Sequence, residues 1–132
     1  MATVFCDTSV LIRYFAEDDI PRAAAAAALI DSGSTLMVST TVILETIHVL
    51  RRRYGIGDDP LSDLLITFLS RVNVQLADAN KTGVLAALAT NKGSTRRVPD
   101  ALIVMAAAQA EVDYIATFDE KLRSPSIEVR ML

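Results

Sequence analysis

A short apolar run that ends at a carboxylate opens the chain: Ala2-Thr3-Val4-Phe5-Cys6-Asp7-Thr8-Ser9. Val4, Phe5 and Cys6 favour a strand and do not alternate with polar residues, which is typical of a strand buried on both faces of a parallel sheet. Asp7 follows directly, where this strand gives way to a loop. Because ligands of open α/β sheets bind beyond the carboxyl ends of the strands, Asp7 is placed for chemistry.

Helix and strand patterns alternate along the rest of the chain. The pattern of apolar residues predicts helices over residues 10–15, 23–30, 42–54, 60–70, 78–90 and 100–111. It predicts further strands over residues 36–38, 72–76, 114–117 and 127–131, the last of them at the sheet edge. This alternation predicts an α/β domain around a mainly parallel central sheet.

Length and composition predict a single globular domain over residues 1–132. The chain is 52% hydrophobic and 22% charged, which excludes a disordered protein. Its longest apolar runs are far shorter than the roughly 20 residues of a membrane span, so no membrane contact is expected. Cys6 is the only cysteine, which excludes an internal disulfide and fits a reducing compartment. We therefore expect a cytoplasmic protein.

The charge balance bears on possible partners. A net charge of -3 and a pI near 5.0 disfavour a protein that binds nucleic acid by bulk positive charge. They allow a nucleic-acid enzyme, because clustered carboxylates can hold metal cations that supply the missing positive charge.

Three further acids could converge on Asp7. Asp119 follows the predicted strand 114–117 by two residues, and Asp100 opens an apolar helix. Glu45 interrupts the most apolar part of helix 42–54, where burying an unpaired charge would cost several kcal/mol. Each acid also has a structural explanation: a turn for Asp119, the helix dipole for Asp100, and an exposed helix flank for Glu45.

Carboxylates that converge repel one another, so such a cluster needs a cation at neutral pH. Oxygen ligands without cysteine or histidine suit Mg²⁺ or Mn²⁺. His48 is the only histidine, which rules out a histidine-rich metal site, and it is interpreted as a helix-surface residue.

Four segments in this order resemble the PIN-domain pattern, and their spacing is most similar to the VapC-type toxin ribonucleases of toxin–antitoxin pairs. They are the stretch at residues 4–12, the helix carrying Glu45, Val98-Pro99-Asp100-Ala101-Leu102-Ile103, and Ala116-Thr117-Phe118-Asp119-Glu120-Lys121-Leu122. The resemblance implies a three-layer α/β/α PIN-like domain with a mainly parallel central sheet. It also implies a catalytic and metal-binding quartet of Asp7, Glu45, Asp100 and Asp119, supported by Thr8, Ser9 and Thr117.

The resemblance further implies a Mg²⁺- or Mn²⁺-dependent endoribonuclease, the toxin of a type II toxin–antitoxin pair, that leaves 5′-phosphate and 3′-hydroxyl ends. It implies a small antitoxin protein and a homodimer as partners. Two positions depart from the pattern: Ser9 stands where an asparagine is common, and His48 where such toxins often carry tryptophan. Both departures bear on substrate preference rather than on the quartet.

Two groups of arginines could bind RNA phosphates. Arg51 and Arg52 lie with Arg53 at the end of the Glu45 helix, and Arg96 and Arg97 precede Asp100. Solvated charge at helix ends explains them equally well. Aromatic residues make up 5% of the chain, which argues against an extensive base-stacking surface and for short contacts to the RNA backbone.

Two other functions share these features. A Mg²⁺-dependent phosphotransfer domain also has a strand that ends at an aspartate, but the sequence lacks the paired acids of a receiver and the Asp-x-Asp of a phosphatase. The second is a non-catalytic PIN-fold RNA-binding module. The homodimer is expected to use the broad apolar face of helix 60–70, which comprises Leu61, Leu64, Leu65, Phe68 and Leu69.

Overall fold

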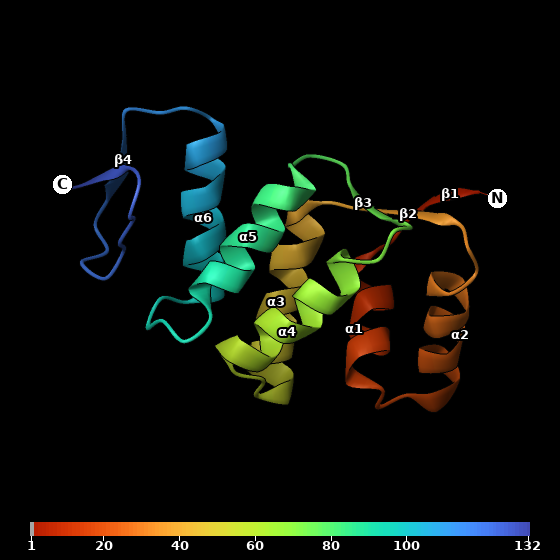
Figure 1. Ribbon diagram of the computed structural model, residues 1–132. Helices are drawn as coiled ribbons and strands as arrows, with labels where there is room; N and C mark the ends of the chain where they lie inside the picture. The colour runs from red at the N-terminus through yellow and green to blue at the C-terminus, as the bar shows by residue number, and fades with distance from the viewer. Residues whose placement is uncertain (1) are drawn as a thin grey trace.

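The computed structural model describes residues 2–132, so only Met1 of the predicted domain lies outside the described residues. Helices and parallel strands alternate along the chain (Figure 1), as predicted for the α/β class. The elements are β1 (Thr3–Phe5), α1 (Thr8–Ala16), α2 (Ile20–Ile30), β2 (Thr35–Val38), α3 (Thr40–Tyr54), α4 (Asp58–Leu69), β3 (Val74–Leu76), α5 (Lys81–Asn91), α6 (Val98–Gln109), β4 (Tyr114–Thr117) and β5 (Glu128–Met131).

The main sheet has three parallel strands in the order β1-β2-β3, consistent with a PIN-like α/β/α fold. Leu36 of β2 pairs in register with Val4 and Val74, and this face lies against the hydrophobic core. The opposite face carries Phe5, whose side chain is 58% exposed. The expectation that β1 is buried on both faces is therefore wrong, because helices cover only one face of this strand.

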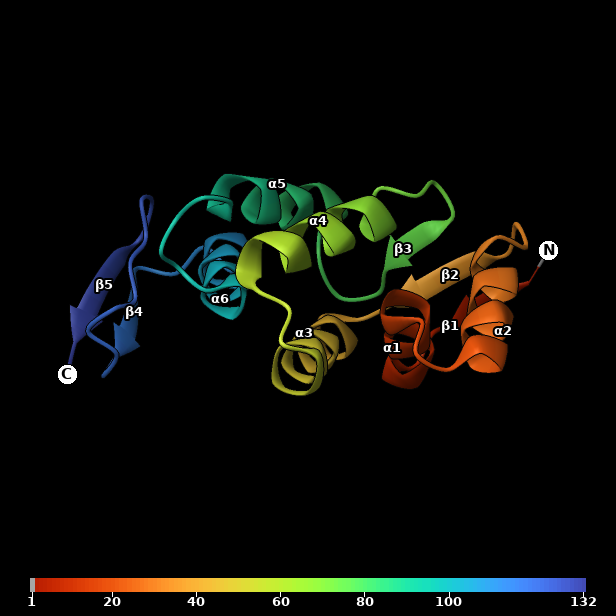
Figure 2. The ribbon, with the colours of Figure 1, turned by 90° about the horizontal axis from the view of Figure 1, so that it is seen from below.

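The last two strands form a separate parallel pair, β4-β5. Both ribbon views place this pair at one end of the molecule, beyond α6, and β1 at the other end (Figures 1 and 2). The prediction that the strand near residues 127–131 forms an edge of the central sheet is therefore wrong. The pattern of each strand is local, whereas its pairing depends on contacts between distant parts of the chain, which the pattern does not specify.

Helix α4 lies in the centre of the core. The side chains of Leu61, Leu65, Phe68 and Leu69 are fully buried, and only Leu64 is half-buried. Phe68 packs edge-on against Phe15 of α1, with ring centroids 5.6 Å apart. The expectation that part of this apolar face lies exposed holds only for Leu64, because α4 uses the rest of the face to bury the protein's own core.

Side-chain caps fix the start of three helices. Asp7, Ser39 and Asn80 cap α1, α3 and α5, each by accepting a hydrogen bond from a backbone N–H. The prediction that this helix begins at Asp78 is wrong, because α5 begins at Lys81. The carboxylate of Asp78 instead accepts hydrogen bonds of 2.9 and 2.7 Å from the N–H and hydroxyl of Thr40, at the start of α3. Among residues 2–132, no helix is long and apolar enough to cross a membrane.

Candidate functional site

Asp7 lies at the junction of β1 and α1, as the opening stretch predicts. Its carboxylate accepts hydrogen bonds from the hydroxyl of Ser9 at 2.7 Å and from the Ser9 backbone N–H at 3.3 Å. These bonds, the hydroxyl first, hold the pKa of Asp7 below its usual value. The carboxylate is exposed and the neighbouring Thr8 is buried, so Asp7 remains ionised and accessible to a cation.

Glu45 lies on the exposed flank of α3. Its neighbours on that flank, Thr41, His48 and Arg52, are exposed as well, whereas Thr46 is fully buried. The exposed position of Glu45 therefore matches its structural explanation. The cost of burying a charge gives no argument that Glu45 is a metal ligand. An exposed carboxylate can still coordinate a metal ion, because its oxygen atoms are free to do so.

Asp100 lies half-buried in the first turn of α6. The residues behind it are buried on one face only: Ala101, Leu102, Val104 and Met105 face the core, and Ile103 is exposed. The apolar sequence of this helix is thus not matched by burial on all sides. Its N-terminus has no side-chain cap, and Asp100 is the acid in its first turn.

Asp119 follows β4, where it forms a local turn. Its backbone N–H donates to the hydroxyl of Thr117 at 2.9 Å, and its carboxylate accepts from the backbone N–H of Lys121 at 2.9 Å. Thr117 thus contacts Asp119 directly, in keeping with a supporting position. Both residues belong to the separate β4-β5 unit.

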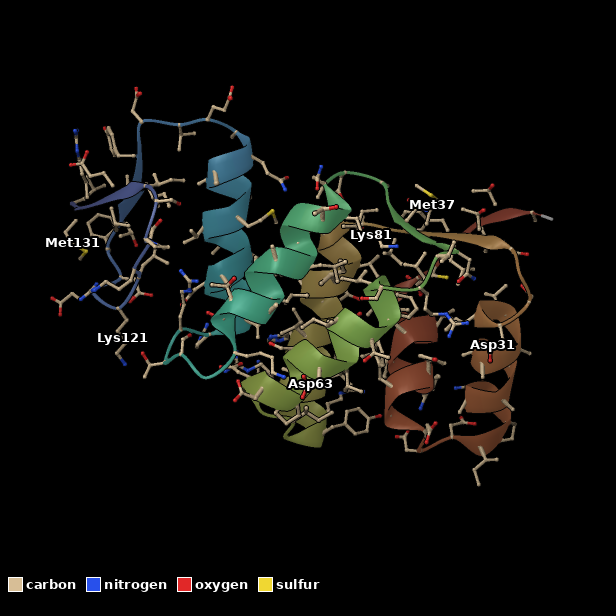
Figure 3. All side chains as sticks on the ribbon, viewed as in Figure 1. Asp31, Met37, Asp63, Lys81, Lys121 and Met131 are labelled. Atoms are coloured by element: carbon tan, nitrogen blue, oxygen red, sulfur yellow. The ribbon has the colours of Figure 1, made fainter. Side chains whose placement is uncertain are left out.

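The four acids do not form one cluster within a single chain. Among residues 2–132, no three histidine, cysteine, aspartate or glutamate side chains lie close enough together to hold a metal ion. Figure 3 shows the separation: Lys121, two residues after Asp119, lies at one end of the molecule, and Met37, the register partner of Phe5 in β1, lies towards the other. The carboxylates have the right chemistry for a hard divalent cation, but this arrangement does not assemble the site.

Three of the four candidate RNA-binding arginines line one hollow between α3 and the start of α6. We call this hollow, of about 490 Å³, the basic pocket; it is lined by Leu44, Ile47, His48, Arg51, Arg52, Arg97 and Pro99. Arg96 points elsewhere, because its guanidinium donates to the side chain of Asn91 at 2.9 Å and to the backbone carbonyl of Arg123 at 3.0 Å. Arg96 therefore holds the C-terminal segment rather than the basic pocket.

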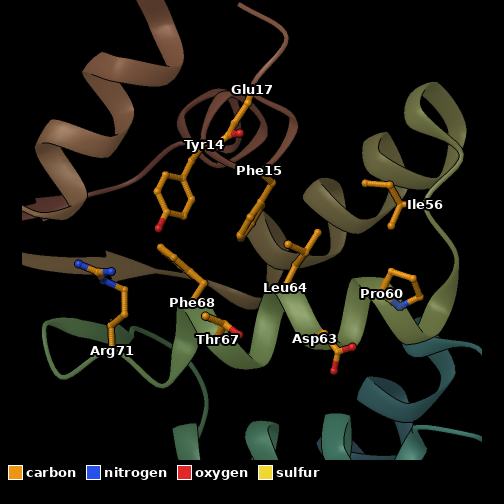
Figure 4. Close-up of a pocket in the computed structure, with 10 residues that line it drawn as sticks. All are labelled: Tyr14, Phe15, Glu17, Ile56, Pro60, Asp63, Leu64, Thr67, Phe68 and Arg71. Carbon is orange, nitrogen blue, oxygen red and sulfur yellow. The ribbon is translucent and has the colours of Figure 1, made fainter. Parts of the chain in front are cut away.

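A larger groove, of about 670 Å³, lies between α1 and α4. Figure 4 shows its wall, formed by Tyr14, Phe15, Leu64 and Phe68. None of the four acids lines it, so this groove is not the candidate catalytic site. Its apolar wall suits a protein side chain better than an RNA phosphate.

Comparison with known proteins identifies the family. The family model of the PIN domain matches residues 4–127, which include all four acids, and the chain therefore belongs to the PIN-domain family. PIN domains are generally nucleases and typically use divalent metals, so the family supports a nuclease at this coarse level. No curated protein matches the chain significantly.

The sequence indicated only the α3 side of the basic pocket. Leu44, His48 and Arg52 follow one another at intervals of four, so they lie on one face of α3, and this spacing could have grouped His48 with the arginines. The contribution of Arg97 and Pro99 had no such signal, because α6 reaches α3 only through the tertiary fold.

Proposed function

We propose that this protein is a Mg²⁺- or Mn²⁺-dependent endoribonuclease, the toxin of a type II toxin–antitoxin pair. The observation that carries the proposal is the PIN-domain match, whose span includes Asp7, Glu45, Asp100 and Asp119. Two features support the proposal: the accessible carboxylate of Asp7, which could bind a cation, and the basic pocket, which could bind an RNA phosphate and adjoins Glu45 and Asp100 in the chain.

The proposed metal ligands are the four carboxylates. A bound divalent ion would polarise the scissile phosphate and activate a water molecule for in-line displacement. Ser9 orients the Asp7 carboxylate, and Thr117 supports the turn that presents Asp119. Thr8 is buried at the start of α1, directly after Asp7.

The ends of the cleaved RNA test the reaction class. We expect incubation of defined RNAs with the protein and Mg²⁺ to yield 5′-phosphate and 3′-hydroxyl ends, because water attacks the phosphorus from the side opposite the 3′ oxygen. Sequencing of the ends after selective ligation measures this. Ends that carry a 2′,3′-cyclic phosphate would contradict the proposal, since they arise from attack by the RNA's own 2′-hydroxyl.

The alternatives make different predictions. A phosphotransfer domain would form a phosphoprotein and would not cleave RNA. The PIN-domain match argues against this alternative. A non-catalytic RNA-binding module would bind RNA and leave it intact. The cleavage assay therefore separates both from a ribonuclease.

The proposed antitoxin partner is a small protein that inhibits the ribonuclease. The groove between α1 and α4 supports such a partner, because its wall of aromatic and aliphatic side chains can bury an apolar segment. Glu17, which also lines the groove, would favour a basic residue beside the apolar segment, whereas the carboxylate of Asp63 is paired with Lys92.

The proposed homodimer is best supported at the open strand edges and not at α4. The Cys6 N–H bonds to Met37 of β2 at 2.9 Å, and alternate residues of a parallel strand face the same neighbour, so the Phe5 N–H points to the open edge of β1. At the other end of the molecule Phe118, beside β4, is 79% exposed. We propose that β4 of a second copy pairs along β1, which would bring Asp119 of that copy to Asp7.

Oligomeric state tests this proposal. We expect light scattering over a concentration series to show a dimer for the natural chain and a shift towards monomer for Phe118→Asp, because a charge at the interface must be desolvated. Val72→Asp is the matched control: Val72 is 92% exposed and lies outside β4 and β1, so this variant should remain a dimer. A monomer at every concentration of the natural chain would exclude the homodimer.

A mixing experiment asks whether two copies share a site. Asp7→Asn and Asp119→Asn, each expected to be inactive alone, are refolded together in equal amounts. Random pairing makes half of the dimers mixed, each with one intact site, so about a quarter of the natural activity should return if β4 is exchanged between copies. No recovery would show that Asp7 and Asp119 of one site belong to the same chain.

A further inference from the structure

The basic pocket holds positive charge that the fold does not use. Arg51 forms an ion pair with Asp58 at 3.3 Å. Within the described residues, neither Arg52 nor Arg97 has an ion-pair or side-chain hydrogen-bond partner, although both line the pocket. Two unpaired guanidinium groups that face one hollow from different helices repel each other, and an anion between them removes that repulsion.

The start of α6 contributes charge and not backbone donors to the same hollow. Arg97 is the N-cap residue of α6, and its side chain makes no capping bond to the backbone, so its guanidinium group is free for a ligand. Pro99 has no N–H, and the Ala101 N–H donates to the Arg97 carbonyl at 3.1 Å. A phosphate in the basic pocket would thus meet charge from two side chains.

The remaining lining of the basic pocket is mixed. Leu44 of α3 and Pro99 of α6 contribute carbon surface, and His48 contributes an imidazole ring. The pocket volume of about 490 Å³ lies within the range of roughly 300–1,000 Å³ that is usual for sites of small organic ligands. Such a lining fits a nucleotide whose phosphate lies on the guanidinium groups and whose sugar or base lies against the other side chains.

We propose that the basic pocket binds one nucleotide of a single-stranded RNA, with its phosphate on Arg52 and Arg97 and its sugar or base against Leu44 and Pro99. The inference deepens the proposed function and rests on it. Leu44 and Pro99 directly adjoin Glu45 and Asp100 in the chain, so a strand held here passes two of the candidate metal ligands. The lining offers one imidazole, that of His48, and no amide side chain, so this nucleotide is recognised mainly by its backbone.

Binding without cleavage tests the pocket separately from the nuclease. The probe is a fluorescein-labelled single-stranded oligoribonucleotide of mixed sequence, measured by anisotropy in EDTA at about 0.1 M salt, with a gel to show that it stays intact. We expect Arg52→Gln and Arg97→Gln each to weaken binding about 5-fold and to reduce the slope of log K against log salt by about 0.7, the value for one phosphate contact on a single strand.

Arg53→Gln is the matched control. Arg53 is an exposed neighbour of Arg52 on α3 and does not line the basic pocket, so its loss should change the affinity less than about 2-fold. Far-UV circular dichroism and thermal melting show whether the three variants remain folded. Equal losses of affinity for all three variants would mean that diffuse positive charge attracts the RNA. Unchanged affinity for Arg52→Gln and Arg97→Gln would mean that RNA does not bind in the pocket. Either result overturns the proposal.

The two proposals fail in different ways. Selective loss of binding with no RNA cleavage by the natural chain would keep the pocket and reject the ribonuclease. Cleavage by the natural chain together with unchanged binding by Arg52→Gln and Arg97→Gln would keep the ribonuclease and reject the pocket.

Discussion

Asp7→Asn and Asp100→Asn should each lower Mn²⁺-dependent RNA cleavage by about 100-fold or more. A catalytic metal ion supplies several kcal/mol of transition-state stabilisation, and each 1.4 kcal/mol is a factor of about ten in rate. An amide oxygen in place of a carboxylate removes one negative charge from a site whose attraction for the ion comes from its carboxylates. The rate of cleavage of a labelled RNA at saturating Mn²⁺ measures the effect.

The substitutions are chosen to preserve the fold. Asparagine at position 7 can still accept the bond from the Ser9 backbone, because its side-chain oxygen caps a helix as well as an aspartate does. Asp113→Asn is the matched control, since this exposed carboxylate in the turn before β4 lies outside the proposed quartet. Undiminished cleavage by the Asp7 or the Asp100 variant would remove that residue from the site.

Chelation should abolish cleavage completely, and Mg²⁺ or Mn²⁺ in excess over EDTA should restore it. The proposed ligands are all carboxylate oxygens, which bind hard divalent cations, and no cysteine or histidine belongs to the quartet. Cleavage is followed first in EDTA and then after stepwise addition of each metal ion.

Circular dichroism in EDTA provides the control for this experiment. The core is built from apolar side chains such as Leu36, Ile47 and Phe68, so removal of metal should leave the fold intact. Full activity in EDTA would falsify metal-dependent hydrolysis. Loss of both fold and activity would indicate instead that the ion has a structural role.

Local patterns in the sequence predicted most of the secondary structure. The run Val4-Phe5-Cys6 forms or adjoins β1, and Asp7 caps the helix that follows it, because a strand pattern and an N-cap each involve only a few neighbouring residues. Helix α3 ends at Gly55, whose backbone φ of 64° is a left-handed conformation that glycine adopts without steric cost. The α/β class and the PIN-domain resemblance follow from the order of these local elements.

Only the tertiary structure decided which surfaces are free and which residues meet. The apolar stripe of α4 is the same whether the helix lies in the core or at an interface, and packing against Phe15 buries it. Likewise Glu45 interrupts an apolar run yet lies on the exposed flank of α3. In both cases the helical period shows which residues share a face, and contacts with distant segments determine what covers that face.

The candidate site shows the same division. The sequence by itself predicted the four candidate acids, three of them at the ends of strands or helices and Glu45 within a helix, and the oxygen-only chemistry that suits a hard cation. The tertiary structure determined that β4 pairs with β5 and lies away from β1, and that Arg97 joins Arg52 in one pocket while Arg96 does not. The physical reason is sequence distance: capping and periodicity act within a few residues, whereas strand order and pockets depend on contacts between segments tens of residues apart.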